Sequence, residues 1–476
     1  MSRKRKRALP LIREAEVVDI ARGGKAIARQ GEWVILVDHA VPGDVVDIQT
    51  TRKKKRYYEG RVVHFHRLSP HRTLPRCAHF DRCGGCKWQD MTYEAQLQYK
   101  EKEVRDQMIR LAGLGEEAAA IIEPILPSEA IYHYRNKLEF TFSARRWLTP
   151  EEIASEKHIE EPALGFHVAG LFDKVLDINE CHLQPEPSNA IRNFIREYTL
   201  QHGYPYFHIR EQRGLMRNLL IRTTTTGEVM VVLSFFEDDR QRIETLLEAV
   251  KERFPGITSL QWVINPKGND TLEGLTVHLY HGRDHILEEM DGLRFKISAK
   301  SFFQTNTRQA ARLYRTVAEF AGLKPEDHVY DLYSGTGTIG LFLARQAGKV
   351  TCIESVAEAV ADARENARLN DIRNVSFLQG EVKALFGDEM FSKEGKPDVV
   401  ILDPPRAGIH PDTVKMLLEV LPAKIVYVSC NPATQARDIQ GLLPAYHPRR
   451  IRPVDMFPHT DHVENVVLLE KTDGNV

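Results

Sequence analysis

The sequence predicts a multidomain α/β protein, because its 476 residues exceed what one hydrophobic core usually organises. Short strand-like runs separated by turns predict a small β-barrel of the oligonucleotide-binding (OB) type at residues 1–68. Mixed strands and amphipathic helices predict a central α+β domain at residues 69–290. Strands that alternate with helices predict a Rossmann-like, doubly wound parallel sheet at residues 291–476.

The barrel prediction depends on five short runs of strand-forming residues near the amino terminus. Turn-forming residues separate them, among which "RGGK" at 22–25 and "PGD" at 42–44 are the clearest. The runs are "EAEVVDIA", "KAIARQ", "EWVILVD", "DVVDIQT" and "YYEGRVVHF". A closed barrel is the usual way for such short strands to bury one face each.

Charge is unevenly distributed along the chain, although the net charge is only −1. Residues 1–76 contain 18 Lys and Arg against 8 Asp and Glu, so the remainder is acidic. A solvated charged face is the simplest interpretation of such a run. However, "RKRKR" at 3–7 and "TRKKKRYY" at 51–58 favour a nucleic-acid partner held by the barrel. We expect removal of residues 1–67 to weaken that binding and to spare chemistry elsewhere, with Lys53, Lys54 and Lys55 contacting phosphates.

The cysteines indicate a metal centre. No segment is apolar enough to span a membrane and none reads as a secretory signal, so we expect a cytoplasmic protein with reduced thiols. Cys77, Cys83 and Cys86 are closely spaced, and Cys181 is a distant fourth candidate ligand. Four thiolates suit zinc or an iron–sulfur cluster, and a three-plus-one arrangement favours the cluster.

The carboxy-terminal part contains a nucleotide-binding turn. "HVYDLYSGTGTIGLFLA" at 328–344 satisfies G-x-G-x-x-G, and Glu354 closes the next predicted strand, so a nicotinamide cofactor is one interpretation. Asp331 before the first glycine, together with the D-P-P sequence at 403–405 after a later strand, favours S-adenosylmethionine. We therefore predict methyl transfer over hydride transfer.

The residues around the D-P-P sequence favour carbon as the methylated atom. Enzymes that methylate exocyclic amines usually have an aromatic residue after D-P-P, where this chain has Arg406. Cys430 ends a strand just before a predicted helix, whose amino terminus is expected to lower the pKa of the thiol. A thiolate that adds to C6 of uracil activates C5 for methylation, after which a base must remove the C5 proton. Glu464 is the predicted base and His462 its competitor, whereas Cys352 is expected to be structural.

The motifs D-P-P-R-x-G, S-C-N-P-x-T-x-x-R-D and H-x-x-H-V-E together resemble those of the RNA uracil-5-methyltransferase family over nearly the full chain. The resemblance implies Cys430 as nucleophile, Glu464 as base and a [4Fe–4S] cluster on Cys77, Cys83, Cys86 and Cys181. It also implies contacts to S-adenosylmethionine from Gln304, Tyr333, Glu354 and Asp403. Ser334 and Asp461 depart from residues common in the family, without removing a required group.

The resemblance also bears on the partner of this protein. The amino-terminal segment is similar to the TRAM domain, an RNA-binding barrel, and family members with both barrel and cluster resemble enzymes that modify uracil in 23S ribosomal RNA. "YRNKLEFTF" at 134–142 resembles a stretch near the RNA, so Arg135, Asn136 and Lys137 are candidate contacts. The alternatives are a tRNA methyltransferase and a non-catalytic iron–sulfur RNA-binding factor. We expect a monomer.

Overall fold

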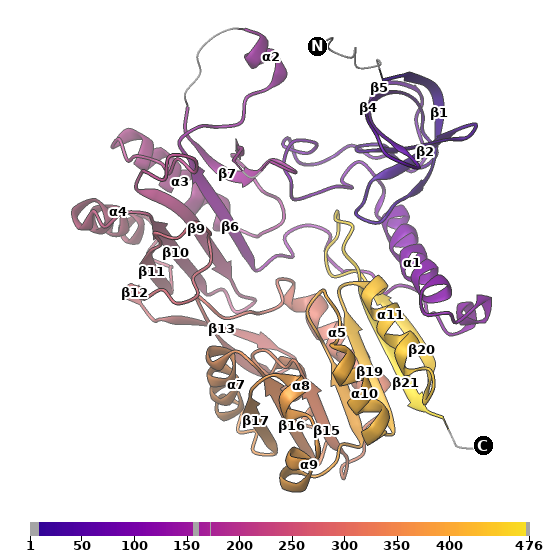
Figure 1. Ribbon diagram of the computed structural model, residues 1–476. Coiled ribbons are helices and arrows are strands. Elements are labelled where there is room, and N and C mark those ends of the chain that lie inside the picture. The colour runs from indigo at the N-terminus through magenta and orange to yellow at the C-terminus, as the bar shows by residue number, and fades with distance from the viewer. Residues whose placement is uncertain (1–8, 156–160, 172, 473–476) are drawn as a thin grey trace, which may run out of the picture.

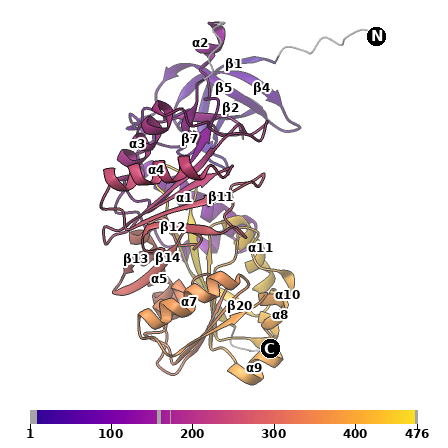
Figure 2. The same ribbon diagram turned by 90° about the vertical axis from the view of Figure 1, so that its left-hand side faces the viewer.

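The computed structural model describes residues 9–155, 161–171 and 173–472. Figure 1 shows the barrel and the central sheet on opposite sides of the molecule, with the carboxy-terminal sheet below both, and the side view shows the barrel at one end and the carboxy-terminal sheet at the other (Figure 2). The basic run at 3–7 lies outside the described residues. Within them, no helix is long and apolar enough to cross a membrane.

The predicted amino-terminal barrel is confirmed as a closed barrel with strand order β1-β2-β3-β5-β4. Its interior is small and apolar, since Ala15, Val17 and Ile35 are almost completely buried. The cations of the "TRKKKR" run lie at the end of β4 and in the turn after it, where they are exposed or half-buried. The strands are β1 (Leu11–Ile20), β2 (Ala26–Gln30), β3 (Trp33–Val37), β4 (Val45–Lys53) and β5 (Tyr58–Arg67).

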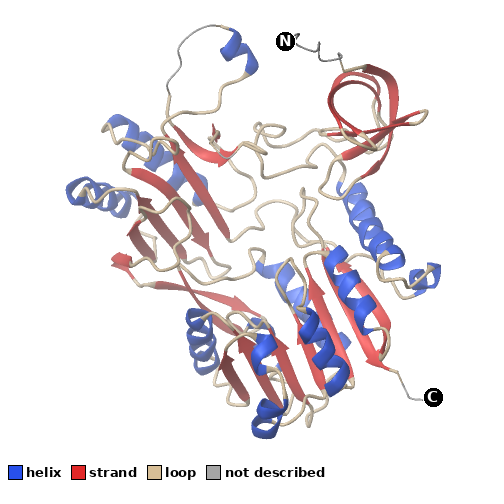
Figure 3. Cartoon of the chain, in the orientation of Figure 1, coloured by secondary structure: helices blue, strands red, loops and turns tan. Residues whose placement is uncertain are grey.

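The central part is a seven-stranded mixed sheet in the order β12-β11-β10-β9-β6-β7-β8. Two amphipathic helices, α3 (Ser188–Gln201) and α4 (Arg240–Arg253), pack against it (Figure 3). The charged stretch 145–163 includes the short helix α2 (Pro150–Ala154). The strands are β6 (Lys137–Ser143), β7 (Ala163–His167), β8 (Val175–Asp177), β9 (Met216–Thr223), β10 (Val229–Phe235), β11 (Ser259–Ile264) and β12 (Val277–Gly282).

The carboxy-terminal sheet has the order β17-β16-β15-β18-β19-β21-β20, with its first five strands parallel. Strand β21 runs antiparallel between β19 and β20. The prediction of a parallel sheet is therefore correct for the first five strands and wrong for the two pairings that β21 makes. The strands are β15 (His328–Leu332), β16 (Lys349–Glu354), β17 (Val375–Gln379), β18 (Val399–Leu402), β19 (Lys424–Ser429), β20 (Tyr446–Val454) and β21 (Glu464–Lys471). The helices that cover it are α5 (Thr307–Ala321), α6 (Thr338–Leu343), α7 (Ala357–Leu369), α8 (Val382–Leu385), α9 (Asp388–Glu394), α10 (Pro411–Val420) and α11 (Pro432–Leu442).

Two connecting elements join these parts. The hairpin of β13 (His285–Met290) and β14 (Leu293–Ser298) contributes to one hydrophobic core that also includes residues of the central sheet and of α5. Helix α1 (Tyr93–Arg110), followed by the 3₁₀ turn η1 (Glu116–Ala120), packs against α11 and β20. Lys100 of α1 forms a fully buried ion pair with Asp455, 2.6 Å apart, which fixes the start of the segment between β20 and β21.

Candidate active site

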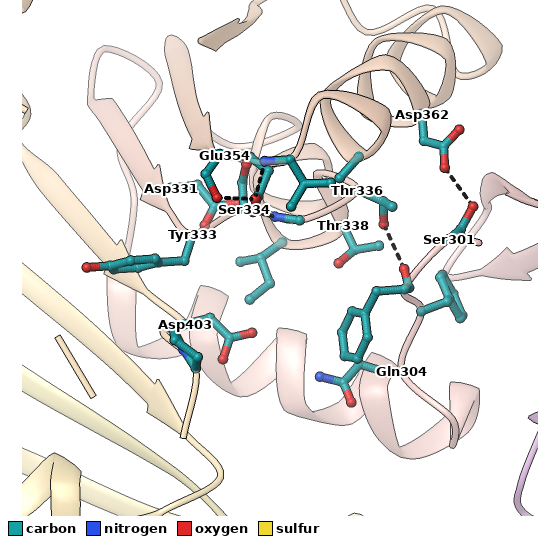
Figure 4. A pocket seen from close by; sticks show the side chains of 18 of the residues that line it. Ser301, Gln304, Asp331, Tyr333, Ser334, Thr336, Thr338, Glu354, Asp362 and Asp403 are labelled. Carbon is teal, nitrogen blue, oxygen red and sulfur yellow. Dashed lines mark hydrogen bonds between the residues drawn. The ribbon is translucent and has the colours of Figure 1, made fainter. Parts of the chain in front are cut away.

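A cavity of about 1010 Å³ lies at the carboxyl ends of the parallel strands. Parallel α/β sheets bind their ligands at this edge. Gln304, Tyr333, Glu354 and Asp403 line the cavity together with Cys430, and Glu464 lines it as well. Six predicted site residues from separate segments thus share one space, part of which is shown in Figure 4.

The glycine-rich turn after β15 is built around two carboxylates. The backbone N–H of Gly335 donates to Glu354 (2.9 Å), whose other oxygen accepts from the N–H of Val356 (2.9 Å). The N–H of Gly340 donates to the fully buried Asp331 (2.9 Å), and burial raises the pKa of this carboxyl to about 8. Tyr333 has a φ of 68°, in the left-handed region, where a non-glycine residue marks local strain. The side chain of Glu354 faces the cavity, as expected of a group that accepts ribose hydroxyls (Figure 4).

Gln304 belongs to a loop that the central domain holds in place. The side-chain amide of Asn136 donates to the carbonyl of Gln304 and to Thr307 Oγ1, both at 2.9 Å, and its backbone N–H donates to the carbonyl of Thr305. Asn306, two residues further on, caps helix α5. Asn136, a candidate RNA contact from sequence, is instead buried and positions the cavity wall.

Asp403, Cys430 and Glu464 lie close enough together in the cavity to interact electrostatically. Burial raises the pKa of Asp403 to about 7. Burial and the nearby Asp403 raise the pKa of Glu464 well above its usual value, while Arg406 opposes this shift. Only 6% of Glu464 is exposed, so bulk water has little access to its carboxyl group. The expectation that desolvation raises the pKa of Glu464 therefore agrees with the structure.

The expected decrease in the pKa of Cys430 is not observed. Burial raises the pKa of this half-buried thiol, and the carboxylates of Glu464 and Asp403 raise it further. A hydrogen bond and the charge from Arg406 lower it. Arg406 also donates to His462 Nδ1 (3.2 Å). In sequence, Arg406 stood out only because an aromatic residue was absent there, and its contact with the thiol depends on the fold.

The four candidate ligand cysteines converge although Cys181 is far from the others in sequence. Each is reduced, and each thiol is close enough to the other three to interact electrostatically with them. Burial raises the pKa of Cys83 to about 12 and that of Cys86 to about 11. Backbone N–H groups of His79, Gly85 and Leu183 hydrogen-bond to thiols of the set. Nevertheless, among the described residues no three or more Cys, His, Asp or Glu side chains are arranged as ligands of one metal ion.

Cys352 lies in β16, fully buried and without access to the cavity, as predicted for a structural cysteine. The profile of the family described as tRNA (uracil-5-)-methyltransferase matches residues 278–472.

Full-length relatives support the same assignment. RNA methyltransferases of Porphyromonas gingivalis and Bacteroides thetaiotaomicron are 53% and 51% identical to the chain, each over 95% of it and over 99% and 100% of their own lengths. The crystal structure of Pyrococcus abyssi tRNA (uracil-54, C5)-methyltransferase with S-adenosyl-L-homocysteine aligns with a TM-score of 0.74 at 29% identity, covering 96% of this chain and 100% of that one. The chain belongs to the RNA uracil-5-methyltransferase family, and S-adenosylmethionine is its methyl donor.

Proposed function

We propose that this enzyme methylates C5 of a uracil in RNA through a covalent adduct on Cys430, with Glu464 as the base. The observation that carries the proposal is the shared cavity, in which a thiol and a desolvated carboxyl group face the predicted cofactor contacts Gln304, Tyr333, Glu354 and Asp403. Methylation at C5 of uracil needs one nucleophile and one base close to a methyl donor, and the cavity supplies both.

The proposed reaction has four steps. The thiolate of Cys430 adds to C6 of the uracil, which makes C5 nucleophilic. C5 then takes the methyl group that S-adenosylmethionine supplies. Glu464 removes the C5 proton, and the electrons of that C–H bond re-form the C5–C6 double bond as the thiolate leaves. Arg406 donates a hydrogen bond to the thiol, so it favours the thiolate at the start and at the end of this sequence.

A substrate in which fluorine replaces the C5 proton tests the proposal. Wild-type enzyme should form a stable covalent complex with 5-fluorouridine RNA and S-adenosylmethionine, because the base cannot remove fluorine. Cys430→Ala should form no such complex. Its dissociation constant for S-adenosylmethionine should stay within about twofold of wild type, since the thiol reacts with the uracil and not with the cofactor. Gel mobility and peptide mass spectrometry measure the adduct. An adduct on Cys430→Ala, or none on wild type with any RNA tested, would contradict the proposal.

We propose 23S ribosomal RNA as the substrate, as the resemblance implied, and tRNA as a second candidate. The Pyrococcus abyssi enzyme acts on uracil 54 of tRNA, and its alignment over 96% of this chain must include the barrel. A barrel therefore does not by itself indicate a ribosomal substrate. Mass spectrometry of 23S RNA and tRNA from a deletion strain distinguishes the two: 5-methyluridine disappears from one and persists in the other.

We also propose a [4Fe–4S] cluster on Cys77, Cys83, Cys86 and Cys181. The mutual proximity of the four thiols and the backbone N–H groups aimed at them support this ligand set. The cluster would have a structural role. The segment that contains three of the cysteines continues directly into residues 87 and 88, whose backbone N–H groups donate to the loop between β20 and β21 that leads to Glu464. We further propose a cytoplasmic, monomeric enzyme.

A further inference from the structure

The turn between β1 and β2 of the barrel contacts the segments that surround the catalytic residues. The carbonyl of Gly23 accepts a hydrogen bond from Lys87 Nζ (2.9 Å), and the carbonyl of Gly24 accepts one from the indole N–H of Trp88 (3.0 Å). Lys87 also forms an ion pair with Asp461 (2.9 Å), whose carboxylate is 10% exposed. The barrel is thus docked on the loop between β20 and β21, and the contact residue Asp461 lies three residues before Glu464.

The docking needs a glycine at position 24. A Cβ atom there would lie 2.9 Å from Lys87 Cδ and 3.0 Å from Asp461 Cβ, both closer than side chains normally approach. The φ of Gly24 is 82°, in the left-handed region. Gly31, in the turn between β2 and β3 of the same barrel, also has a positive φ (56°) but nothing within 4 Å of its would-be Cβ. Of these two glycines, only Gly24 combines this conformation with contact to the loop between β20 and β21.

Two sets of hydrogen bonds connect the turn to the reacting groups. The backbone N–H groups of Lys87 and Trp88 both donate to the carbonyl of His459 (2.8 and 3.1 Å), which fixes the loop that leads to Glu464. On the other side, Arg22 donates to Asn431 Oδ1 (3.0 Å), the residue after Cys430. The amide of Asn431 donates in turn to the carbonyl of Arg406 (2.8 Å), whose guanidinium contacts the thiol.

We propose that the Arg22–Gly24 turn of the barrel is a positioning element of the catalytic centre, which holds the loops of the nucleophile and of the base in register. The inference rests on the proposed roles of Cys430 and Glu464. These contacts do not support the expectation that the barrel can be removed without effect on the chemical step. Loops shaped by a neighbouring domain hold reacting groups precisely only while that domain remains docked, and a small displacement of such groups lowers rates strongly.

Gly24→Ala tests the proposal without changing any charge, so contacts to RNA phosphates stay intact. At saturating RNA, we expect its first-order rate constant of methyl transfer to fall by about tenfold, because the new methyl group displaces Asp461 by a few tenths of an ångström. Its dissociation constant for RNA should change by less than about twofold, and Gly31→Ala should match wild type in both. In an Asp461→Gly background, which removes one of the two opposing side-chain atoms, Gly24→Ala should lower the rate constant by a smaller factor than in the wild-type background.

Equal losses in Gly24→Ala and Gly31→Ala, or a loss confined to RNA affinity, would overturn the proposal. If Gly24→Ala does not fold, Trp88→Phe removes the indole donor to Gly24 and must lower the same rate constant. Amide hydrogen exchange provides a readout that needs no activity: exchange at residues 457–463 should accelerate in Gly24→Ala and not in Gly31→Ala, with the barrel strands unchanged. The two proposals fail on different results. Absence of RNA methylation by wild type would refute the proposed function, whereas unchanged hydrogen exchange at 457–463 in Gly24→Ala would refute the positioning role.

Discussion

Replacement of Glu464 by Gln separates the late proton transfer from the earlier steps. Gln keeps the size of the side chain and removes its basicity, so Cys430 can still add and the methyl group can still transfer. The C5 proton then has no acceptor, because Glu464 is 6% exposed and water cannot readily replace it. Loss of a positioned base usually costs about 10²–10⁴ in rate, equivalent to roughly 3–5 kcal/mol of barrier. Asp403 lies close enough for its charge to raise the pKa of Glu464, and partial substitution by it would give the smaller loss.

The assay for Glu464→Gln is a single-turnover reaction with natural RNA, quenched and analysed by denaturing gel and mass spectrometry. A methylated protein–RNA adduct should accumulate, which wild type releases. In wild type the release rate should rise with pH through the raised pKa of Glu464, because the carboxyl group holds a proton below that pKa and cannot accept another. This pH dependence should disappear in the variant.

Glu470→Gln is a matched control, since it removes a carboxylate from the same strand far from the cavity and should turn over normally. Normal turnover by Glu464→Gln would refute its role as the base. Accumulation of the adduct by His462→Ala instead would assign that role to His462, whose pKa is lowered mainly by burial.

Two further predictions concern the metal centre and the barrel. Anaerobically purified enzyme should contain about four irons per chain, and Cys181→Ser should lose them as completely as Cys83→Ser; one zinc per chain without iron would contradict the cluster. Replacement of the exposed Lys55 or Arg56 by Gln should each reduce the slope of log affinity against log salt by about one and leave the methylated uridine unchanged. A changed methylation site with an unchanged slope would mean that these cations recognise sequence.

Local sequence patterns were sufficient to predict much of this protein. Short alternating runs predicted the barrel, and the G-x-G-x-x-G turn with D-P-P predicted the cavity edge, because residue spacing along a strand or turn sets geometry over a few residues. The chemical types of Cys430 and Glu464 likewise predicted the reaction, and the family comparison agrees with it at the level of RNA uracil methylation. The antiparallel insertion of β21 between β19 and β20 was not visible, because strand order is a property of the whole sheet.

The electrostatics of the site and the coupling between domains were decided only by the tertiary structure. Sequence predicted a lowered pKa for Cys430 from the adjacent helix, whereas burial and the carboxylates of Glu464 and Asp403 raise it in the fold. Asn136 was expected at the RNA and instead holds the loop of Gln304, because its buried amide is satisfied there by the carbonyl and Thr307. In the sequence, Gly24 indicated only a turn. The structure shows that Lys87 and Asp461, the latter more than 400 residues away in the chain, leave no room for a Cβ atom there. A local sequence pattern contains information about residues that are close along the chain, whereas pKa values and close packing depend on which distant groups folding brings together.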